Sequence, residues 1–423
     1  PARTVWKLNM SPIMSECKLK SLAAEPVAAT TPQSAPIERS AFYIESEGQP
    51  LFAWLHTTSS TRTLDHGVVI CAPVGHEQLH AHRGLRHLAD ALAAWNVPVL
   101  RFDWHGTGDS AGLDGDPDRV RTWRANLRDA IRWMRGQLGC RRISLIGLRV
   151  GATFAASFSS EEEIENLILW SPISKGRAYA REMLAVDLTS ELRPKPKNAN
   201  PKDVEAAGFL LTEESTADLS QLNLLKDPVK CRRALIVEQA ELPDDRQLFN
   251  RLASLGIPVE QFAVAGLSGM LTEPHRGTVP QEAIQQIAAW CGRQLEEPST
   301  AGVRATSDDA SLAGGDLGLF DGRAVLGSRR ITLQHRPELP ASDATGCSIR
   351  EQAVRISDNP QLFGILSEPE TVADNLPTIV LLNAGASYRI GPGRLHVQMA
   401  RELAARGFRC LRLDLCGLGD SVT

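Results

Sequence analysis

The sequence predicts an α/β fold, that is, a mostly parallel sheet with helices on both of its faces. Between positions 68 and 295, short apolar runs typical of buried strands alternate with amphipathic helical stretches. One mainly apolar run, 143–146, leads directly into Gly147-Leu148-Arg149-Val150-Gly151, where small residues then favour a helix. This pattern predicts a strand, a sharp turn and a helix, and we expect the rest of the chain to be organised around it.

The element order is expected to begin with an antiparallel hairpin at the sheet edge, formed by 41–44 and 51–55 around a turn-rich gap. A strand over 68–71, a helix over 83–95 and a strand over 97–102 then form a β-α-β unit, with the helix marked by leucines at helical spacing. The remaining expected elements are a helix over 119–138, strands over 143–147 and 167–170, a strand over 234–238, a helix over 245–255, a strand over 259–264 and a helix over 281–295.

This alternation predicts one complete domain over 37–296. Within it, the polar, partly helical segment 175–226 is too long for an ordinary connection, so we expect a cap. Residues 1–36 mix Ala, Pro, Ser and Thr without periodicity and are expected to be a disordered tail. Residues 297–345, rich in Ser, Gly, Asp and Ala, are expected to be a linker, and 346–423 a partial second domain.

A repeat supports the second domain. Leu51-Phe52 recurs as Leu362-Phe363, 311 positions later, and Gly106-x-Gly108-Asp109-Ser110 recurs as Gly417-x-Gly419-Asp420-Ser421 at the same offset. In the first copy, Asp103 and these glycines and acids are expected to form a scaffold loop rather than to catalyse. Because the repeat stops before the later strands and helices, we expect an open strand edge, and we expect contact between the two repeats.

Composition excludes several functions. The net charge is −4 with no basic stripe, which argues against nucleic acid as a partner. The eight cysteines form no C-x-x-C pair, so we expect reduced thiols and a cytoplasmic location, and no cofactor is expected. No apolar run is long enough to span a bilayer, so neither export nor membrane insertion is expected. Because the chain begins with Pro1 rather than Met, we expect processing or a fragment.

Four short motifs carry a resemblance to a known family. They are Ala72-Pro73-x-Gly75-x-Glu77, His82-Arg83, Gly147-Leu148-Arg149-x-Gly151-Ala152 and Glu273-Pro274-His275. With them, residues 37–296 resemble the α/β-hydrolase superfamily in its serine-aminopeptidase-like branch, and they are similar to hydrolase-like proteins of bacterial exosortase and exopolysaccharide loci. The resemblance implies an α/β-hydrolase fold with a nucleophile elbow at Gly147–Gly151, where the middle residue is ordinarily Ser.

Arg149 occupies that nucleophile position. A guanidinium stays protonated and offers only donors, so it cannot attack a carbonyl as a serine oxygen does. The family order of a triad places its acid at Asp244 or Asp245 and its base at His275. A capping role for the aspartates and a solvated loop position for His275 are the simpler interpretations. Because a cation is unfavourable at a helix N-terminus, we expect Arg149 to pair with a carboxylate, most simply Asp244, Asp245 or Glu273.

The resemblance also implies an oxyanion site. Its backbone donors are expected at Val150, directly after the elbow, and in the loop with Gly75 and His76. Polar residues crowd this loop, which we expect to continue to the helix start at position 83. We regard their spacing as no strong metal-binding motif, so no metal is expected.

Three functions stay open at this point. The inherited reaction is hydrolysis of an ester or amide, which the missing serine puts in doubt for the first domain. A second interpretation is a pseudoenzyme that binds a small anionic ligand or a partner through Arg149. In the third, the activity is carried by the part of the second domain that this sequence lacks.

Overall fold

A computed structural model of the chain describes residues 35–59, 65–189, 200–242, 246–296, 328–332, 348–370 and 376–422. All of them lie in one compact unit, Gln33–Thr423. We call residues 35–296 the N-terminal module and the described residues from 328 onwards the C-terminal module. The tail expected over 1–36 lies outside the described residues as far as position 34.

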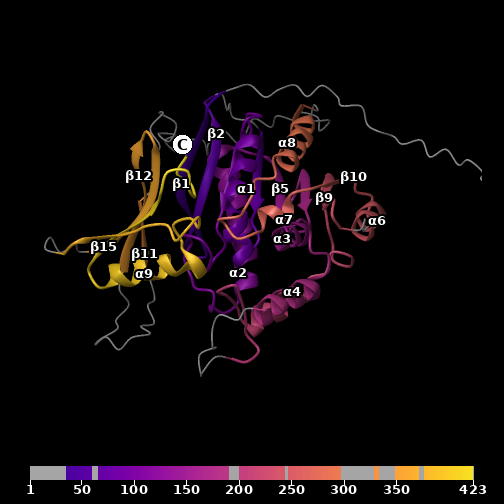
Figure 1. The fold of residues 1–423 in the computed structure, drawn as a ribbon. Helices are drawn as coiled ribbons and strands as arrows, with labels where there is room; N and C mark the ends of the chain where they lie inside the picture. Colours follow the sequence, from indigo (N-terminus) through magenta and orange to yellow (C-terminus); the bar gives the residue numbers. More distant parts are fainter. Residues whose placement is uncertain are drawn as a thin grey trace, which may run out of the picture. The chain divides into compact units, whose positions relative to one another are not determined.

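The N-terminal module is built on an eight-stranded sheet of order β1-β2-β4-β3-β5-β6-β9-β10 (Figure 1). β1 and β2 form an antiparallel hairpin and β2 runs antiparallel to β4, whereas all other neighbours are parallel. The strands are β1 Ile37–Ser46, β2 Gln49–Thr58, β3 His66–Cys71, β4 Val99–Phe102, β5 Arg142–Leu148, β6 Asn166–Trp170, β9 Arg233–Gln239 and β10 Val259–Val264. The prediction of an α/β fold with a mostly parallel sheet is confirmed.

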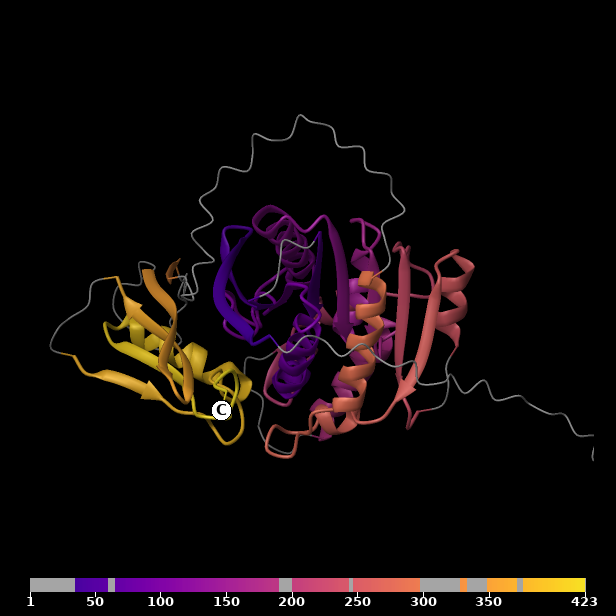
Figure 2. The ribbon, with the colours of Figure 1, turned by 90° about the horizontal axis from the view of Figure 1, so that it is seen from above.

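Helices cover both faces of this sheet, as the ribbon seen from above shows (Figure 2). Buried side chains of α1 and α8 join one apolar core, with residues of α7, and those of α2, α3 and α6 join the other. The helices are α1 His76–Ala93, α2 Arg119–Leu138, α3 Val150–Phe158, α6 Gln247–Ser254, α7 Leu267–Met270 and α8 Gln281–Glu296. Across the described residues, no helix is both long and apolar enough to cross a membrane.

Helix α1 starts earlier than the sequence predicts. We expected a loop over 76–82, but the helix begins at His76, after Gly75 with φ 65°. Polar residues in the first two turns conceal the apolar period, yet Glu77, Gln78 and His82 are all buried. The start expected at Arg83 is therefore wrong, because burial here does not follow hydrophobicity.

The segment expected to form a cap contains four elements. They are α4 Gly176–Thr189, β7 Val204–Ala206, β8 Phe209–Leu211 and α5 Glu213–Gln221, and residues 190–199 lie outside the described structure. β7 and β8 pair as a two-stranded hairpin, with Ala207 and Gly208 at its tip. This hairpin is called the cap hairpin below.

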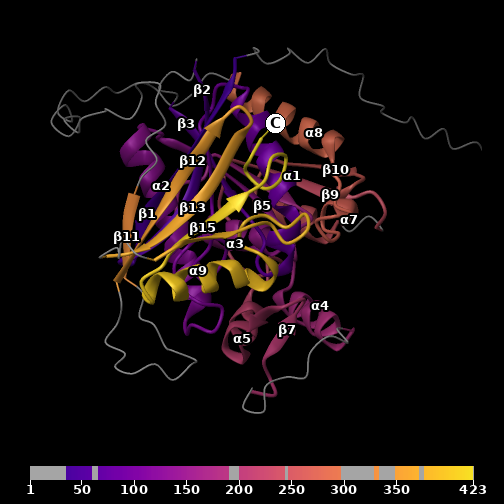
Figure 3. The same cartoon turned by 60° about the vertical axis from the view of Figure 1, so that its left-hand side comes forward.

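The C-terminal module has its own five-stranded sheet, of order β11-β12-β13-β15-β14 (Figure 3). The strands are β11 Ser328–Thr332, β12 Ser348–Asp358, β13 Gln361–Pro369, β14 Thr378–Leu381 and β15 Arg409–Asp414, and helix α9 spans Leu395–Ala405. β11 falls within the stretch 297–345 that composition marked as a linker, so at these five residues the expectation is wrong. β11 pairs antiparallel with β12, and the rest of that stretch lies outside the described residues.

Strand pairing in the two modules has the same register at the 311-residue offset. Ala53 pairs with Phe102 in the N-terminal module, and Gly364 pairs with Leu413 in the C-terminal module. The parallel pairs agree as well, since Val68 opposes Val99 where Ile379 opposes Cys410.

The loops after β4 and β15 also share their hydrogen bonds. The amide of Phe52 donates to Ser110 Oγ over 2.9 Å, and the amide of Phe363 donates to Ser421 Oγ over 2.9 Å. In each loop a carboxylate accepts a backbone N–H six residues on, with Asp109 N to Asp103 Oδ2 at 2.9 Å. The second loop repeats this contact with Asp414 and Asp420.

Buried contacts join the two modules. Side chains on the outer faces of β1 and β2 alternate with core residues and pack against β12 and β13, with the rings of Trp54 and Phe363 4.6 Å apart. Beside this apolar layer lies a buried charge network. Arg389 binds Asp109, Asp414 and Asp420, at 2.7 to 2.8 Å. Charges without solvent access need such pairing, because each unpaired ion would cost several kcal/mol.

Candidate functional site

The turn after β5 has the backbone of a nucleophile elbow. Arg149 has φ 54° and ψ −123°, a strained conformation for a residue with a side chain, and its N–H donates to Trp170 O over 2.9 Å. Helix α3 begins at the next residue. A Cβ at Gly147 would collide with the backbone of Ala152, and one at Gly151 would collide with the carbonyls of Cys71 and Ala72. Glycine is required at both positions by close approach, with no dependence on the residue between them.

The Arg149 side chain is bound by two carboxylates. Its Nε donates to Glu77 Oε1 over 2.8 Å, and its Nη2 donates to Glu182. Burial disfavours the charged form, but the charges of Glu77 and Glu182 outweigh it and raise the pKa of Arg149. Glu77 lies in the first turn of α1, and Glu182 lies on α4 in the cap. The ion pairs therefore connect the elbow to two other parts of the module. One is the first turn of α1, which follows the expected oxyanion loop at Gly75 and His76, and the other is the cap.

These partners differ from those we expected. A carboxylate partner was predicted, but the sequence analysis did not consider Glu77 or Glu182. Glu273 instead lies 3.5 Å from His275 Nε2, and both side chains are more than half exposed. Asp244 and Asp245 lie outside the described residues. No sequence signal links Glu77 to Arg149, because the two residues are 72 positions apart and meet only in the folded chain.

The expected oxyanion donors occupy two helix starts. Val150 is the first residue of α3, and Gly75 and His76 stand at the start of α1. Since Glu77 and Arg149 form an ion pair, these two helix N-termini lie close together. Burial, followed by the charges of His80 and Arg149, lowers the pKa of His76 to about 4, so its imidazole is neutral at pH 7.

His275, which the family order places as the triad base, lies on an exposed loop, and its side chain is 59% exposed. It follows β10 and α7 in the chain order that the family requires, and its loop is held to α1 where His80 Nδ1 lies 2.8 Å from Leu271 O. Within the described part of the chain, His275 forms an ion pair with Glu273 when its imidazole is protonated. The structure thus brings Arg149 and the oxyanion loop together and leaves His275 on an exposed loop.

We regarded the spacing of the polar residues after Gly75 as no strong metal-binding motif, but His76-Glu77-Gln78-Leu79-His80 has the H-E-x-x-H spacing of zinc-binding helices. In the structure they lie on α1, with the two imidazole rings 5.5 Å apart. Among the described residues, no group of three or more His, Cys, Asp or Glu could hold a metal ion. Glu77, which would act as the base of such a site, is bound by a guanidinium instead.

Two buried polar atoms beside the ion pair have no hydrogen-bond partner within the described part of the chain. They are Glu77 Oε2 and the hydroxyl of Tyr179, which comes from α4. Glu77 is 4% exposed and Tyr179 is fully buried. Burial of both groups makes a water or a small polar group a favourable neighbour here.

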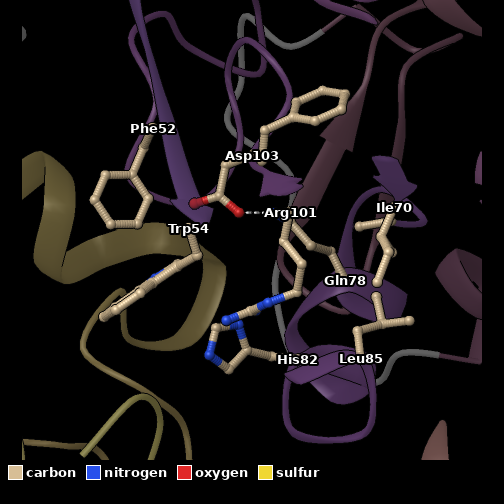
Figure 4. A pocket seen from close by; sticks show the side chains of 10 residues that line it. Phe52, Trp54, Ile70, Gln78, His82, Leu85, Arg101 and Asp103 are labelled. Atoms are coloured by element: carbon tan, nitrogen blue, oxygen red, sulfur yellow. Dashed lines mark hydrogen bonds between the residues drawn. The ribbon is translucent and has the colours of Figure 1, made fainter. Parts of the chain in front are cut away.

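A separate cavity of about 20 Å³ lies between α1 and strands β2, β3 and β4 (Figure 4). His82, Arg101, Phe52 and Trp54 line it, and Gln78 Nε2 donates to Asp103 Oδ1 over 2.9 Å at its wall. This volume holds about one water molecule. None of the elbow residues line this cavity.

Comparison with known families agrees with this geometry. Residues 66–215 match the family described as serine aminopeptidase, S33. This segment contains β3, the start of α1, the elbow and most of the cap. Over residues 66–215 the N-terminal module is therefore similar to the serine-aminopeptidase-like branch of the α/β-hydrolases, and its strand order and the strained turn at Arg149 agree with that similarity.

Several solved esterases have similar structures. Est1E from Butyrivibrio proteoclasticus, solved with ferulic acid, is 18% identical and covers 61% of this chain and 100% of its own, with a TM-score of 0.44. The Pyrococcus furiosus esterase Pf2001 is 17% identical over 61% of this chain and 90% of its own, with a TM-score of 0.41.

One curated protein is related over a short region. Mitochondrial ribosome-releasing factor 2 from Bos taurus is 30% identical over 151 residues, which is 35% of this chain. The chain spans 18% of that protein's length.

Proposed function

We propose that the N-terminal module is an α/β-hydrolase-family domain without serine-hydrolase activity. The inherited reaction class is hydrolysis of an ester or amide. The observation that supports this proposal is the ion pairing of Arg149, which fills the nucleophile position and is tied to Glu77 and Glu182. Loss of a triad nucleophile typically costs on the order of a millionfold in turnover.

The test is labelling of the full chain by a fluorophosphonate probe, together with turnover of short-chain aryl esters. We expect neither, in the wild type or in Arg149→Ala. Ser171 needs its own control, because it is a buried serine at the end of β6 with φ 47°. Its Oγ accepts from Gln239 Nε2 over 2.8 Å. Labelling that Ser171→Ala abolishes, with ester turnover lost in His275→Ala, would refute the proposal.

A second candidate function is binding of a small anionic ligand at Arg149. Arg149 carries one positive charge against two carboxylates, so an anion can bind only if it replaces one of them. Glu182 is the exchangeable partner, because its side chain is 47% exposed whereas that of Glu77 is 5% exposed. If this function holds, Glu182→Gln should tighten binding of acetate or inorganic phosphate at least tenfold, as isothermal titration would measure.

We further propose that residues 346–423 are the first part of a second hydrolase-like copy. Support comes from the shared strand register and the shared loop hydrogen bonds at the 311-residue offset. At that offset Thr423 corresponds to Gly112, so a chimera can continue the chain after Thr423 with residues 113–296 of the N-terminal module. We expect the added segment to protect β14 from hydrogen exchange, and unchanged exchange in β14 would contradict the second copy.

A cytoplasmic location is also part of the proposal. The described cysteines are all free thiols, including the exposed Cys416. The similarity to proteins of bacterial exosortase loci likewise stays a proposal. If the second copy is real, an active elbow in its remaining part is the third candidate for the activity.

A further inference from the structure

The tip of the cap hairpin lies against the oxyanion loop. A Cβ at Gly75 would lie 3.6 Å from the Cβ of Phe209, which is ordinary van der Waals contact. Phe209 begins β8, directly after the tip residues Ala207 and Gly208. The hairpin is therefore placed to cover the start of α1, next to the Arg149 ion pairs.

The C-terminal module supplies the other surface that this tip contacts. Phe209 packs against a buried apolar cluster in which Leu79 comes from α1, and Tyr388, Ile390 and Val397 come from the C-terminal module. The hairpin tip also meets the segment before α9 directly, since a Cβ at Gly393 would lie 2.6 Å from the carbonyl oxygen of Gly208. Only glycine at position 393 allows this approach.

The contacting segment differs from its equivalent in the N-terminal module. At the 311-residue offset, residues 387–394 correspond to 76–83, which form the first two turns of α1. In the C-terminal module α9 begins only at Leu395, after the short 3₁₀ turn Pro392–Arg394, and Gly391 and Gly393 both have positive φ. Glycine and proline disfavour the α-helix, so this segment projects as a loop.

That loop is itself held to the N-terminal module. The Arg394 guanidinium donates to the carbonyls of Gly108, Ser110 and Gly112 in the loop after β4. Arg401 adds bonds to the carbonyls of Asp109 and Ser110. Movement of the loop away from the cap hairpin would break these buried charge-assisted bonds, so the loop is a fixed support.

We propose that loop 387–394 is the seat on which the cap hairpin closes, so that the C-terminal module controls access to the Arg149 site. The hairpin is held by apolar contact with this seat and by two hydrogen bonds at Leu210, whose N–H donates to Asp114 Oδ2 over 3.1 Å and whose carbonyl accepts from Arg119 over 3.2 Å. Loss of the apolar contact should let the hairpin open while the parallel sheet stays folded. The proposal does not depend on whether the elbow catalyses.

The test is peptide-resolved hydrogen exchange on the full chain, for Phe209→Ala in the hairpin and Val397→Ala in α9. We expect exchange over 204–211 and over 73–78 to become at least tenfold faster in both variants, with β5 and β9 unchanged. Leu188→Ala is the matched control, because Leu188 lies on α4 in the cap and is 78% exposed. It should leave the hairpin protected.

Two results would overturn the proposal. One is wild-type protection of the hairpin in both variants. The other is equal acceleration in β5, which would mean global destabilisation. If Val397→Ala unfolds the C-terminal module altogether, the hairpin must still lose its protection, and a hairpin that stays protected would show that the seat is not needed.

Discussion

The two modules begin with the same strand pairing and differ in what covers it. Val69 and Val380 occupy equivalent positions, in β3 and β14, yet Val69 is fully buried and Val380 is 49% exposed. Cys71 is likewise buried where Leu382 is 53% exposed. In the N-terminal module this face is covered by α2 and α3, and β3 pairs with β5 on its other side. The strands therefore pair in the same way without the covering helices, whereas burial of their side chains requires those helices.

The modules also differ in how their charges are arranged. Arg101 binds Asp420 over 3.2 Å, and its equivalent Arg412 binds Asp109, so the two arginines reach across to the opposite loop. A second pair is reversed. Arg39 lies opposite His56 and binds Asp90, whereas Glu351 lies opposite Ser367, the equivalent of His56, and binds Arg401, the equivalent of Asp90. The crossed pairs join the modules, whereas each reversed pair lies within its own module.

The largest predicted difference between the modules is at the crossed arginines. Arg412 is fully buried and binds two carboxylates, Asp109 and Glu351, whereas Arg101 binds Asp420 and the neutral His56. We expect Arg412→Ala to cost about 3 to 5 kcal/mol in the stability of the C-terminal module, because buried carboxylates lose a partner. Hydrogen exchange of the β13 amides measures this.

Arg101→Ala is the matched comparison and should cost less, because Arg101 binds one carboxylate rather than two, and that carboxylate, Asp420, retains Arg389 and His82. Equal costs, or a larger cost for Arg101→Ala, would contradict the larger contribution of Arg412 to stability.

The matched valines give a second, smaller effect. Val69→Ala should cost about 2 to 3 kcal/mol, because it removes buried methyl groups and leaves a cavity. Val380→Ala should cost less than about 0.5 kcal/mol, as at most exposed sites. The measurements are exchange of β5 and β15 amides, respectively. A large cost at Val380 would mean that something covers β14 in solution.

The third effect is a pH dependence in the loop after β4. Burial and the charge of Asp109 raise the pKa of Asp103 to about 6. The folded state therefore binds this proton more tightly than the unfolded state, and the contribution of Asp103 to stability is greatest below about pH 4 and falls as pH rises to 6. Asp103→Asn should reduce the loss of unfolding free energy between pH 4 and 7 by about 2 kcal/mol.

Glu47→Gln, at a surface ion pair, is the control for this pH effect and should leave the pH profile unchanged. A profile that Asp103→Asn also leaves unchanged would contradict the raised pKa of Asp103.

Much of the fold could be predicted because it depends on local patterns. The strand expected over 259–264 is β10, and the helix expected over 119–138 is α2, since apolar period and glycine turns mark both. The start of α1 could not be predicted, because its first turns bury polar groups such as Glu77 and His82. β11 was missed because a strand of five residues has too short a pattern.

The site was predictable only in part. Arg149 and the tight turn follow from the sequence around Gly147 and Gly151. The carboxylates that bind Arg149 are 72 and 33 positions away, so only tertiary structure identifies Glu77 and Glu182 as its partners. The loop that contacts the cap hairpin was also missed, since no motif in the sequence connects Gly393 with Gly208.

The most direct test of the account is a double-mutant cycle on Arg149 and Glu77, measured as the free energy of unfolding of the N-terminal module in denaturant. Arg149→Met should destabilise by about 3 kcal/mol or more, because it leaves the buried Glu77 carboxylate without its partner, and Glu77→Gln by about 2 kcal/mol or more, because Arg149 then keeps only Glu182. The double variant should cost no more than the worse single variant, which gives a coupling of about 2 kcal/mol or more. Additive costs would contradict the ion pair that fills the nucleophile position.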